Sequence, residues 1–289
     1  MKVSARAIRA DVQAARARHP ELFAPSWRHR ATVIGIVSLL LGLFAFGFWR
    51  LEFSFQKVLS GLGQLGSLLW LMLPPNPGSW AKFFTFLNAL AETVAIAFLG
   101  TLLAALIAFP IGLIAARNTT VNRLVQFASR RVLDGIRGID TLIWALLWIN
   151  VVGLGPFAGV LAIMTSDIGT FGKLFSEAIE AADKKPVEGI ASTGGSRLNQ
   201  IRFGILPQVF PVLAGQVLYF FESNTRSGTI IGIVGAGGIG LHLAEQIRTL
   251  EWQAVSFLVI MILIIVAIID AVSARLRSSI IGSPRQPSA

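Results

Sequence analysis

The sequence predicts an all-α membrane protein with about six transmembrane helices and with both termini in the cytoplasm. Of its 289 residues, 54% are hydrophobic and only 14% are charged, whereas soluble domains carry about 25% charged residues. The apolar residues also form runs close to the roughly 20 residues that a helix needs to cross a bilayer. A third observation, the distribution of the basic residues between these runs, predicts the orientation.

The apolar runs define the predicted helices in chain order. The first run, residues 31–49, has the length of one crossing. The second, 83–116, is longer than one crossing needs and contains Pro110, so we expect a tilted or kinked helix. Asp167 interrupts one of the later runs and weakens it. The four later runs are 132–152, 157–175, 207–222 and 252–272.

An amphipathic stretch with Gly and Pro lies between the first two runs, at residues 51–82. We interpret it as an interfacial or periplasmic helix followed by a loop. A seventh crossing is the alternative.

The basic residues predict the orientation. The segments expected inside hold 18 Lys and Arg residues, and those expected outside hold 5. Because cytoplasmic loops are enriched in Lys and Arg, both termini are predicted to be cytoplasmic. The tail 1–30 has no signal-peptide layout. It fits an amphipathic helix on the anionic lipid surface, with basic residues at Arg6, Arg9, Arg16 and Arg18.

Several function classes are disfavoured by composition. There is no cysteine, which excludes disulfides and thiolate metal sites. His19, His29 and His242 lack metal-ligand spacing. No phosphate-binding G-x-x-x-x-G-K-[ST] pattern occurs, so we do not expect this chain to be an ATPase. The basic residues do not interleave with exposed aromatic residues, so no nucleic-acid partner is expected.

The polar segment between the fourth and fifth runs is predicted to form two helices. Asp183 suits the N-cap of the first helix, and Gly194-Gly195 suits its end. Ser196 suits the N-cap of the second helix, which we expect to end at Leu206-Pro207, where Pro207 begins the next crossing. Ordinary helix connections take 2–8 residues, so this longer segment indicates a docking element.

The same segment resembles the coupling loop of binding-protein-dependent ABC importer permeases. Their pattern is Glu-Ala-Ala, three residues, Gly, nine residues, Ile, one residue and Leu-Pro. Counting from Glu188 places Gly194, Leu206 and Pro207 at the matching positions. Gly189-Ile190 and Gly204 depart from the pattern.

A wider tract, within 132–277, resembles the phosphonate permeases. One departure is Ile139-Asp140-Thr141, where that branch commonly has Ile-Pro-Glu, and it leaves the start of the third helix open. The resembling stretches are 144–147, 152–161, 172–180, 204–209 and 234–240.

This resemblance implies a type I ABC importer permease fold in the bacterial inner membrane. It implies a transport subunit for phosphonate or a related phosphorus oxyanion, such as phosphite or phosphate. The implied partners are an ATPase dimer, a periplasmic solute-binding protein and a second copy of the chain. ATP and Mg would bind to the ATPase partner, and this chain would hold no cofactor. Glu188, Gly194, Leu206 and Pro207 would couple the chain to the ATPase.

Other functions stay open at this point. An ABC permease for another small solute, such as an amino acid, is one. A channel or carrier that works without an ATPase is another. A membrane enzyme is the third, although we find no converging catalytic groups in the sequence.

The glycine-rich segment at 235–240 satisfies G-x-G-x-x-G, as dinucleotide-binding loops do. Those loops need an acidic residue about 20 positions further on, and residues 252–269 contain none. The family resemblance implies a periplasmic gate region instead. The glycines concerned are Gly235, Gly237, Gly238 and Gly240.

Four of the charged residues within or near the apolar runs are candidates for a role, because charges in a membrane usually face the bundle interior. Glu222 and Arg226 are four residues apart, which suits an ion pair; alternatively, Arg226 faces the pathway and helps an oxyanion enter. Asp167 belongs either to an interhelical polar cluster or to the pathway. Glu92 is expected to form a hydrogen bond between helices.

These predictions divide the chain into five segments. They are a basic cytoplasmic tail at 1–30, a first transmembrane helix at 31–50, a periplasmic or interfacial segment at 51–82, a permease core at 83–277 with the coupling loop at 177–207, and a cytoplasmic tail at 278–289.

Overall fold

The computed structural model describes residues 27–120 and 122–281. Every secondary-structure element in these ranges is helical, which confirms the all-α class. The amphipathic helix predicted in the N-terminal tail lies largely outside the described residues, as does most of the C-terminal tail. The chain forms two compact units, residues 1–67 and 68–289.

The described part of the first unit holds α3 (Trp27–Arg50) and most of α4 (Phe55–Leu71). Within α3, residues Arg30–Arg50 have the length and hydropathy of a membrane crossing, in agreement with the first predicted run. The 17 residues of α4 are about 26 Å long, short of the roughly 30 Å of a bilayer core. This length is at the lower limit for a crossing helix, so the interfacial helix stays a prediction.

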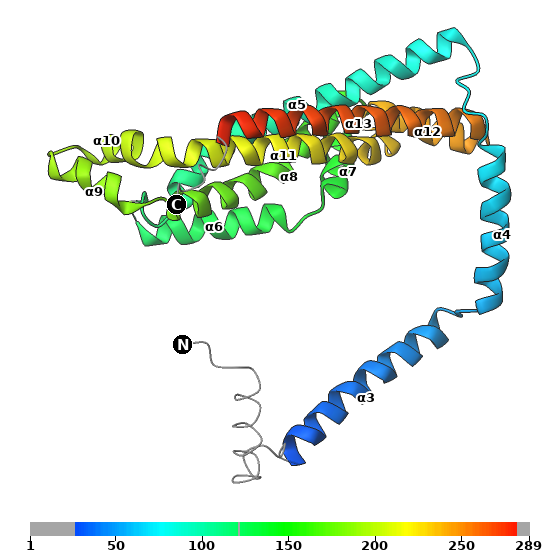
Figure 1. Ribbon diagram of the computed structural model, residues 1–289, viewed down its shortest axis with the longest axis horizontal. Helices are drawn as coiled ribbons and strands as arrows, with labels where there is room; N and C mark the ends of the chain where they lie inside the picture. The colour runs from blue at the N-terminus through cyan, green and yellow to red at the C-terminus, as the bar shows by residue number, and fades with distance from the viewer. Residues whose placement is uncertain (1–26, 121, 282–289) are drawn as a thin grey trace, which may run out of the picture. The chain divides into compact units, whose positions relative to one another are not determined.

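The second unit is a helical bundle whose elements are shown in Figure 1. A short connection after α4 leads to α5, the longest helix of the unit. The elements are α5 (Trp80–Ala115), α6 (Arg123–Arg137), α7 (Thr141–Val152), α8 (Pro156–Glu180), α9 (Lys184–Ser192), α10 (Arg197–Asn199), the π-helical turn η1 (Gln200–Ile205), α11 (Leu206–Ile233), α12 (Ile239–Arg248) and α13 (Trp252–Ile281).

Small residues allow α5 and α8 to approach closely at the centre of this bundle. A Cβ atom at Gly100 would lie 2.8 Å from the Cβ of Ile163, and one at Gly112 would lie 2.9 Å from the Cβ of Phe175. Small residues at helix interfaces are how membrane helices gain packing contacts, because lipid gives them no hydrophobic drive to associate. The α5–α8 pair therefore forms the framework on which α6, α7 and α11 pack.

The run at 132–152 is not one helix, contrary to the sequence prediction. It contains the end of α6 and all of α7, and these two helices meet at an angle of 87°. The break follows from local chemistry: Gly138 ends α6, and the Asp140 carboxylate accepts a hydrogen bond from the Leu142 N–H at 2.8 Å to cap α7. With 12 residues, α7 alone is about 18 Å long, too short to cross a bilayer.

By length and composition, four helical segments among the described residues are long and apolar enough to cross a membrane, or five if the bent α6–α7 pair counts as one. The predicted number was about six. The helix that accounts for this difference is α8. Its 25 residues are enough to cross a bilayer, but it carries the charged residues Asp167 and Lys173. Its polar residues lower its hydropathy, and the bundle covers much of it.

Candidate functional site

The polar segment after α8 forms the predicted helix, glycine turn and second helix. The Asp183 carboxylate caps α9 by accepting a hydrogen bond from the Lys185 N–H at 3.1 Å. At the other end Gly194 has φ +79°, and the N–H of Gly195 donates to the carbonyl of Ile190 at 3.0 Å. These are the features of a Schellman helix end. Glu188 lies in the middle of α9 with its side chain exposed.

The second helix was predicted to end at Leu206-Pro207. In the structure it continues past these residues. The Ser196 hydroxyl caps α10, and the chain then stays helical through η1 into α11, so that Arg197–Ile233 is one segment of 37 residues. Pro207 lacks an N–H and crowds the carbonyl four residues before it in an α-helix. The π-helical turn just before Pro207, where the Leu206 N–H donates to Ile201 five residues back, accommodates this defect.

Close packing of η1 against α9 explains one departure from the family pattern. Gly204 is buried, and a Cβ atom there would lie 3.2 Å from the Cα of Val187. The isoleucine that the pattern places here would separate the two helices. Gly204 therefore permits the contact by which α9 lies against the base of α11.

One glutamine of α11, Gln208, bonds to Asp183, the N-cap residue of α9. The Gln208 side chain accepts from the Asp183 N–H at 2.9 Å and donates to the Asp183 carbonyl at 3.2 Å. It also donates to the Gly204 carbonyl at 2.5 Å. Gln208 lies in the resembling stretch 204–209, but no role could be predicted for it, because its partner lies 25 residues away.

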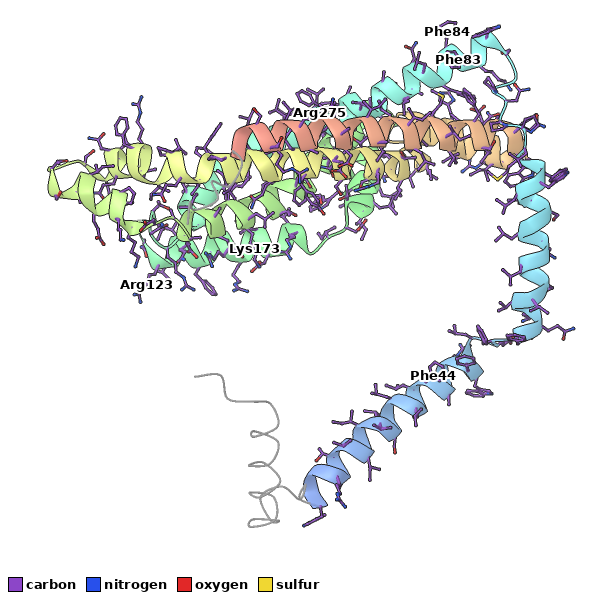
Figure 2. All side chains as sticks on the ribbon, in the orientation of Figure 1. Phe44, Phe83, Phe84, Arg123, Lys173 and Arg275 are labelled. Carbon is purple, nitrogen blue, oxygen red and sulfur yellow. The ribbon has the colours of Figure 1, made fainter. Side chains whose placement is uncertain are left out.

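A second junction connects α8, α6 and the end of α5 beside the loop. The Glu180 carboxylate accepts from the Arg117 N–H at 2.6 Å and from the Arg130 guanidinium at 2.7 Å. Nearby, the Lys173 ammonium of α8 lies 3.1 Å from the Asp134 carboxylate of α6 and joins the two helices. Lys173 is labelled in Figure 2. Sequence reasoning missed this junction, because no local pattern links positions 50 residues apart.

Asp167 lies in a buried polar network inside the bundle. Its carboxylate accepts a hydrogen bond of 2.5 Å from the Asn224 amide, which also donates to the Thr101 hydroxyl at 2.8 Å. All three side chains are buried, and they come from α8, α11 and α5. The structure therefore contains the interhelical cluster that the sequence analysis offered as one alternative for Asp167.

The glycine-rich segment is a tight turn that joins α11 to α12. Gly235, Gly237 and Gly238 have φ values of +101°, +85° and +77°, which side chains rarely adopt. A Cβ atom at Gly240 would collide with the Thr229 carbonyl. Each of the four predicted glycines therefore meets a steric requirement of its own.

Two side chains of α5 hold the start of α12. The Glu92 carboxylate accepts from the Gly238 N–H at 2.7 Å, and the Thr93 hydroxyl accepts from the Ile239 N–H at 2.8 Å. A negative group at the first N–H groups of a helix satisfies donors that have no partner within the helix. The turn borders a cavity of about 300 Å³ that Glu92, Leu154 and His242 help to line.

Glu222 and Arg226 form the ion pair that the sequence analysis weighed. The Arg226 guanidinium lies 3.3 Å from the Glu222 carboxylate on α11. The Arg226 side chain is 54% exposed and that of Glu222 is 12% exposed. This pairing leaves Arg226 accessible at the bundle surface.

A comparison with protein families decides the assignment. Residues 108–281 match the family described as "Binding-protein-dependent transport system inner membrane component". The chain belongs to this family. The permease is therefore an inner membrane component of a binding-protein-dependent transport system, a role that calls for a solute-binding protein and an ATPase as partners.

Several relatives of the permease carry the names of phosphorus transporters. It is 40% identical over 259 residues to HtxC of Stutzerimonas stutzeri, named as a phosphite transport system permease protein, with 90% of this chain and 89% of HtxC covered. It is 32% identical to the phosphite transport system permease protein PtxC of the same organism, with 87% and 89% covered. It is 34% identical to the phosphate-import permease protein PhnE of Mycolicibacterium smegmatis, with 88% and 47% covered.

Among solved structures, the permease resembles the inward facing MetNI methionine ABC transporter. The TM-score is 0.63 at 18% identity, with 70% of this chain and 99% of that chain covered. At this identity the likeness establishes the fold, which is that of an ABC importer permease.

Proposed function

We propose that this permease imports a phosphorus oxyanion, with phosphite, phosphonate and phosphate as the candidates. The main support is that relatives covered over most of their length carry the names of phosphite permeases. The likeness to methionine transporters is weaker, with 18% identity to the solved structure and 26% identity over 159 residues to the MetI permease of Pasteurella multocida, so a phosphorus oxyanion is preferred over an amino acid.

The coupling to ATP hydrolysis takes place through the loop from α9 to η1. A partner ATPase dimer holds ATP and Mg and docks on the exposed α9 helix, where Glu188 contacts it. Gly194 permits the turn between the two loop helices, as its φ of +79° requires. Leu206 and Pro207 lie in the uninterrupted helix that leads from the loop into α11.

The proposed topology has six crossings with both termini in the cytoplasm. The six are the four long segments, the bent α6–α7 pair and α8. The excess of Lys and Arg in the segments assigned to the cytoplasm supports this orientation, with 18 residues against 5. The 28 residues of α11 are about 42 Å long, which suits a loop on one face of the membrane and the glycine turn on the other.

The transported solute passes between two copies of the permease. A periplasmic solute-binding protein delivers it to the face that carries the glycine turn, which serves as the gate. Among the charges within the proposed crossings, the three acids Glu92, Asp167 and Glu222 accompany the bases Lys173 and Arg226, and Lys173 is paired with Asp134. Such a pathway binds anions weakly, so the delivering protein supplies the selectivity.

Uptake assays test this proposal. In cells that depend on this transporter for phosphite, Glu188→Lys and Gly194→Phe are expected to abolish uptake, because the first reverses the charge on the docking face and the second cannot adopt the positive φ without strain. Membrane insertion, followed by immunoblotting of membrane fractions, is expected to be unchanged. Normal phosphite uptake in both variants would refute the coupling role, and wild-type cells that take up no phosphite, phosphonate or phosphate would refute the substrate class.

A further inference from the structure

We infer that Gln208 is the positioning residue that makes α9 and α11 move as one body. This inference rests on the proposed coupling role of the loop and assigns to one side chain the transmission of movement from the loop to the membrane helices.

The geometry of the Gln208 amide suits a connection between α9 and α11. Its oxygen accepts from the Asp183 N–H at 2.9 Å, and its nitrogen donates to the Asp183 carbonyl at 3.2 Å. The side chain therefore pairs with the backbone of Asp183 through both polar groups, as a neighbouring β-strand would. The second N–H of the amide donates to the Gly204 carbonyl, so both donors and the oxygen of the side chain bond to the base of the loop.

The position of Asp183 gives these bonds their effect. Asp183 is the N-cap of α9, and its own carboxylate accepts from the Lys185 N–H. A displacement of α9 therefore pulls on the backbone that Gln208 holds. On the other side, α8 ends at Glu180, and the link from α8 to α9 is only Ala181 and Ala182 before the cap. These small side chains offer no polar group to tie α9 to α8.

Packing in the first turn of α9 reinforces the same connection. Val187 lies against Gly204, and a Cβ atom added at Gly204 would come within 3.1 Å of a Val187 methyl group. The helix is thus held to η1 by contact and to α11 by hydrogen bonds. Movement of α9 passes into α11, and from there to Asn224 and the buried network with Asp167 and Thr101.

A distance measurement tests the connection directly. The chain contains no cysteine, so spin labels can be placed on single cysteines without background. Labels at Ala191 and Val212, both exposed, report the separation of α9 from α11 in full-length permease diluted with unlabelled chain. Gln208→Met keeps the length of the side chain and removes its hydrogen bonds, so the distance distribution is expected to broaden.

The matched control is Gln216→Met, two turns further along α11. The Gln216 oxygen has no hydrogen-bond partner among the described residues, so this variant is expected to keep the narrow wild-type distribution. Gln208→Glu provides a second test that does not depend on the folding of the methionine variant. It keeps the acceptor for Asp183 N–H but sets a carboxylate against the carbonyls of Asp183 and Gly204, and it is expected to broaden the distribution as well.

The functional consequence is measured in proteoliposomes that contain the permease, its ATPase partner and its solute-binding protein. With phosphite as the probe, the amount taken up per ATP hydrolysed is expected to fall about tenfold in Gln208→Met. This factor corresponds to about 1.4 kcal/mol, comparable to one net hydrogen bond. Membrane insertion and ATPase binding are expected to be retained.

The possible results separate the two proposals. A narrow distribution and wild-type uptake per ATP in both Gln208 variants would overturn the role of Gln208 and leave the importer assignment intact. Wild-type proteoliposomes without ATP-driven uptake of phosphite, phosphonate or phosphate would overturn the proposed function, whereas the distance measurement would still decide whether Gln208 joins α9 to α11.

Discussion

The amide of Asn224 connects three helices through two hydrogen bonds. It donates to Asp167 on α8 and to Thr101 on α5 while lying on α11. A carboxylate in a membrane bundle is costly unless it has a partner, and among the described residues Asn224 is the side chain that donates to Asp167. The pair therefore stabilises the packing of α11 against α8.

Exchanging the two residues tests this pairing. Asn224→Leu leaves the Asp167 carboxylate without this donor and is expected to cost about 1–3 kcal/mol of stability. The double variant Asp167→Asn with Asn224→Asp restores one amide and one carboxyl at the same contact, and it is expected to be more stable than either single variant. Thermal unfolding of the purified permease in detergent measures this, and a double variant no better than the singles would contradict the pairing.

The sequence revealed residues whose partners are close in the chain. Asp183, Gly194 and Ser196 were assigned correctly because helix capping depends on groups two to six residues away. Asn224 and Gln208 were given no such role because their partners lie 57 and 25 residues away. Hydropathy marks where a helix crosses the membrane, but it does not show which buried side chains meet.

The start of α12 depends on another helix for its cap. Gly238 precedes the helix and has no side chain, so α5 supplies the acceptors through Glu92 and Thr93. This arrangement fixes the turn after α11 to the longest helix of the bundle. A change in that contact alters the turn without touching the coupling loop.

Removing the carboxylate of Glu92 is therefore expected to loosen this turn. Glu92→Leu leaves the Gly238 N–H without an acceptor and is expected to reduce stability by about 1–2 kcal/mol, whereas Glu92→Gln keeps an acceptor and costs less. Amide hydrogen exchange across 235–242 measures the effect. Equal protection in Glu92→Leu and the wild type would show that the contact contributes nothing.

Breaks in the helices were harder to predict than the helices themselves. The run at 132–152 is apolar enough to suggest one crossing, but Gly138 and the capping Asp140 divide it. At Pro207 the error was the opposite, because the π-helical turn at 200–205 lets the helix continue. In both cases local hydrogen bonding decided the outcome, and average hydropathy does not contain this information.

The bundle as a whole is proposed to place the coupling loop and the α12 end on opposite faces of the membrane. Single cysteines test this arrangement, since the natural chain has none. In intact cells with a permeable outer membrane, a membrane-impermeant maleimide is expected to label Arg248→Cys but not Ser192→Cys. Both positions are exposed, and Ser192→Cys is expected to react after the inner membrane is opened. Labelling of Ser192→Cys in intact cells would reverse the proposed orientation.

The uninterrupted helical segment Arg197–Ile233 contains 37 residues and is about 55 Å long. If it pivots as a stiff rod, a tilt of about 5° at one tip sweeps the other through about 5 Å, close to one helical pitch. Such leverage means that a small push from the nucleotide cycle suffices to rearrange the distant gate. Two successive glycines inserted midway along this segment would make it flexible, and the movement would then not reach the gate.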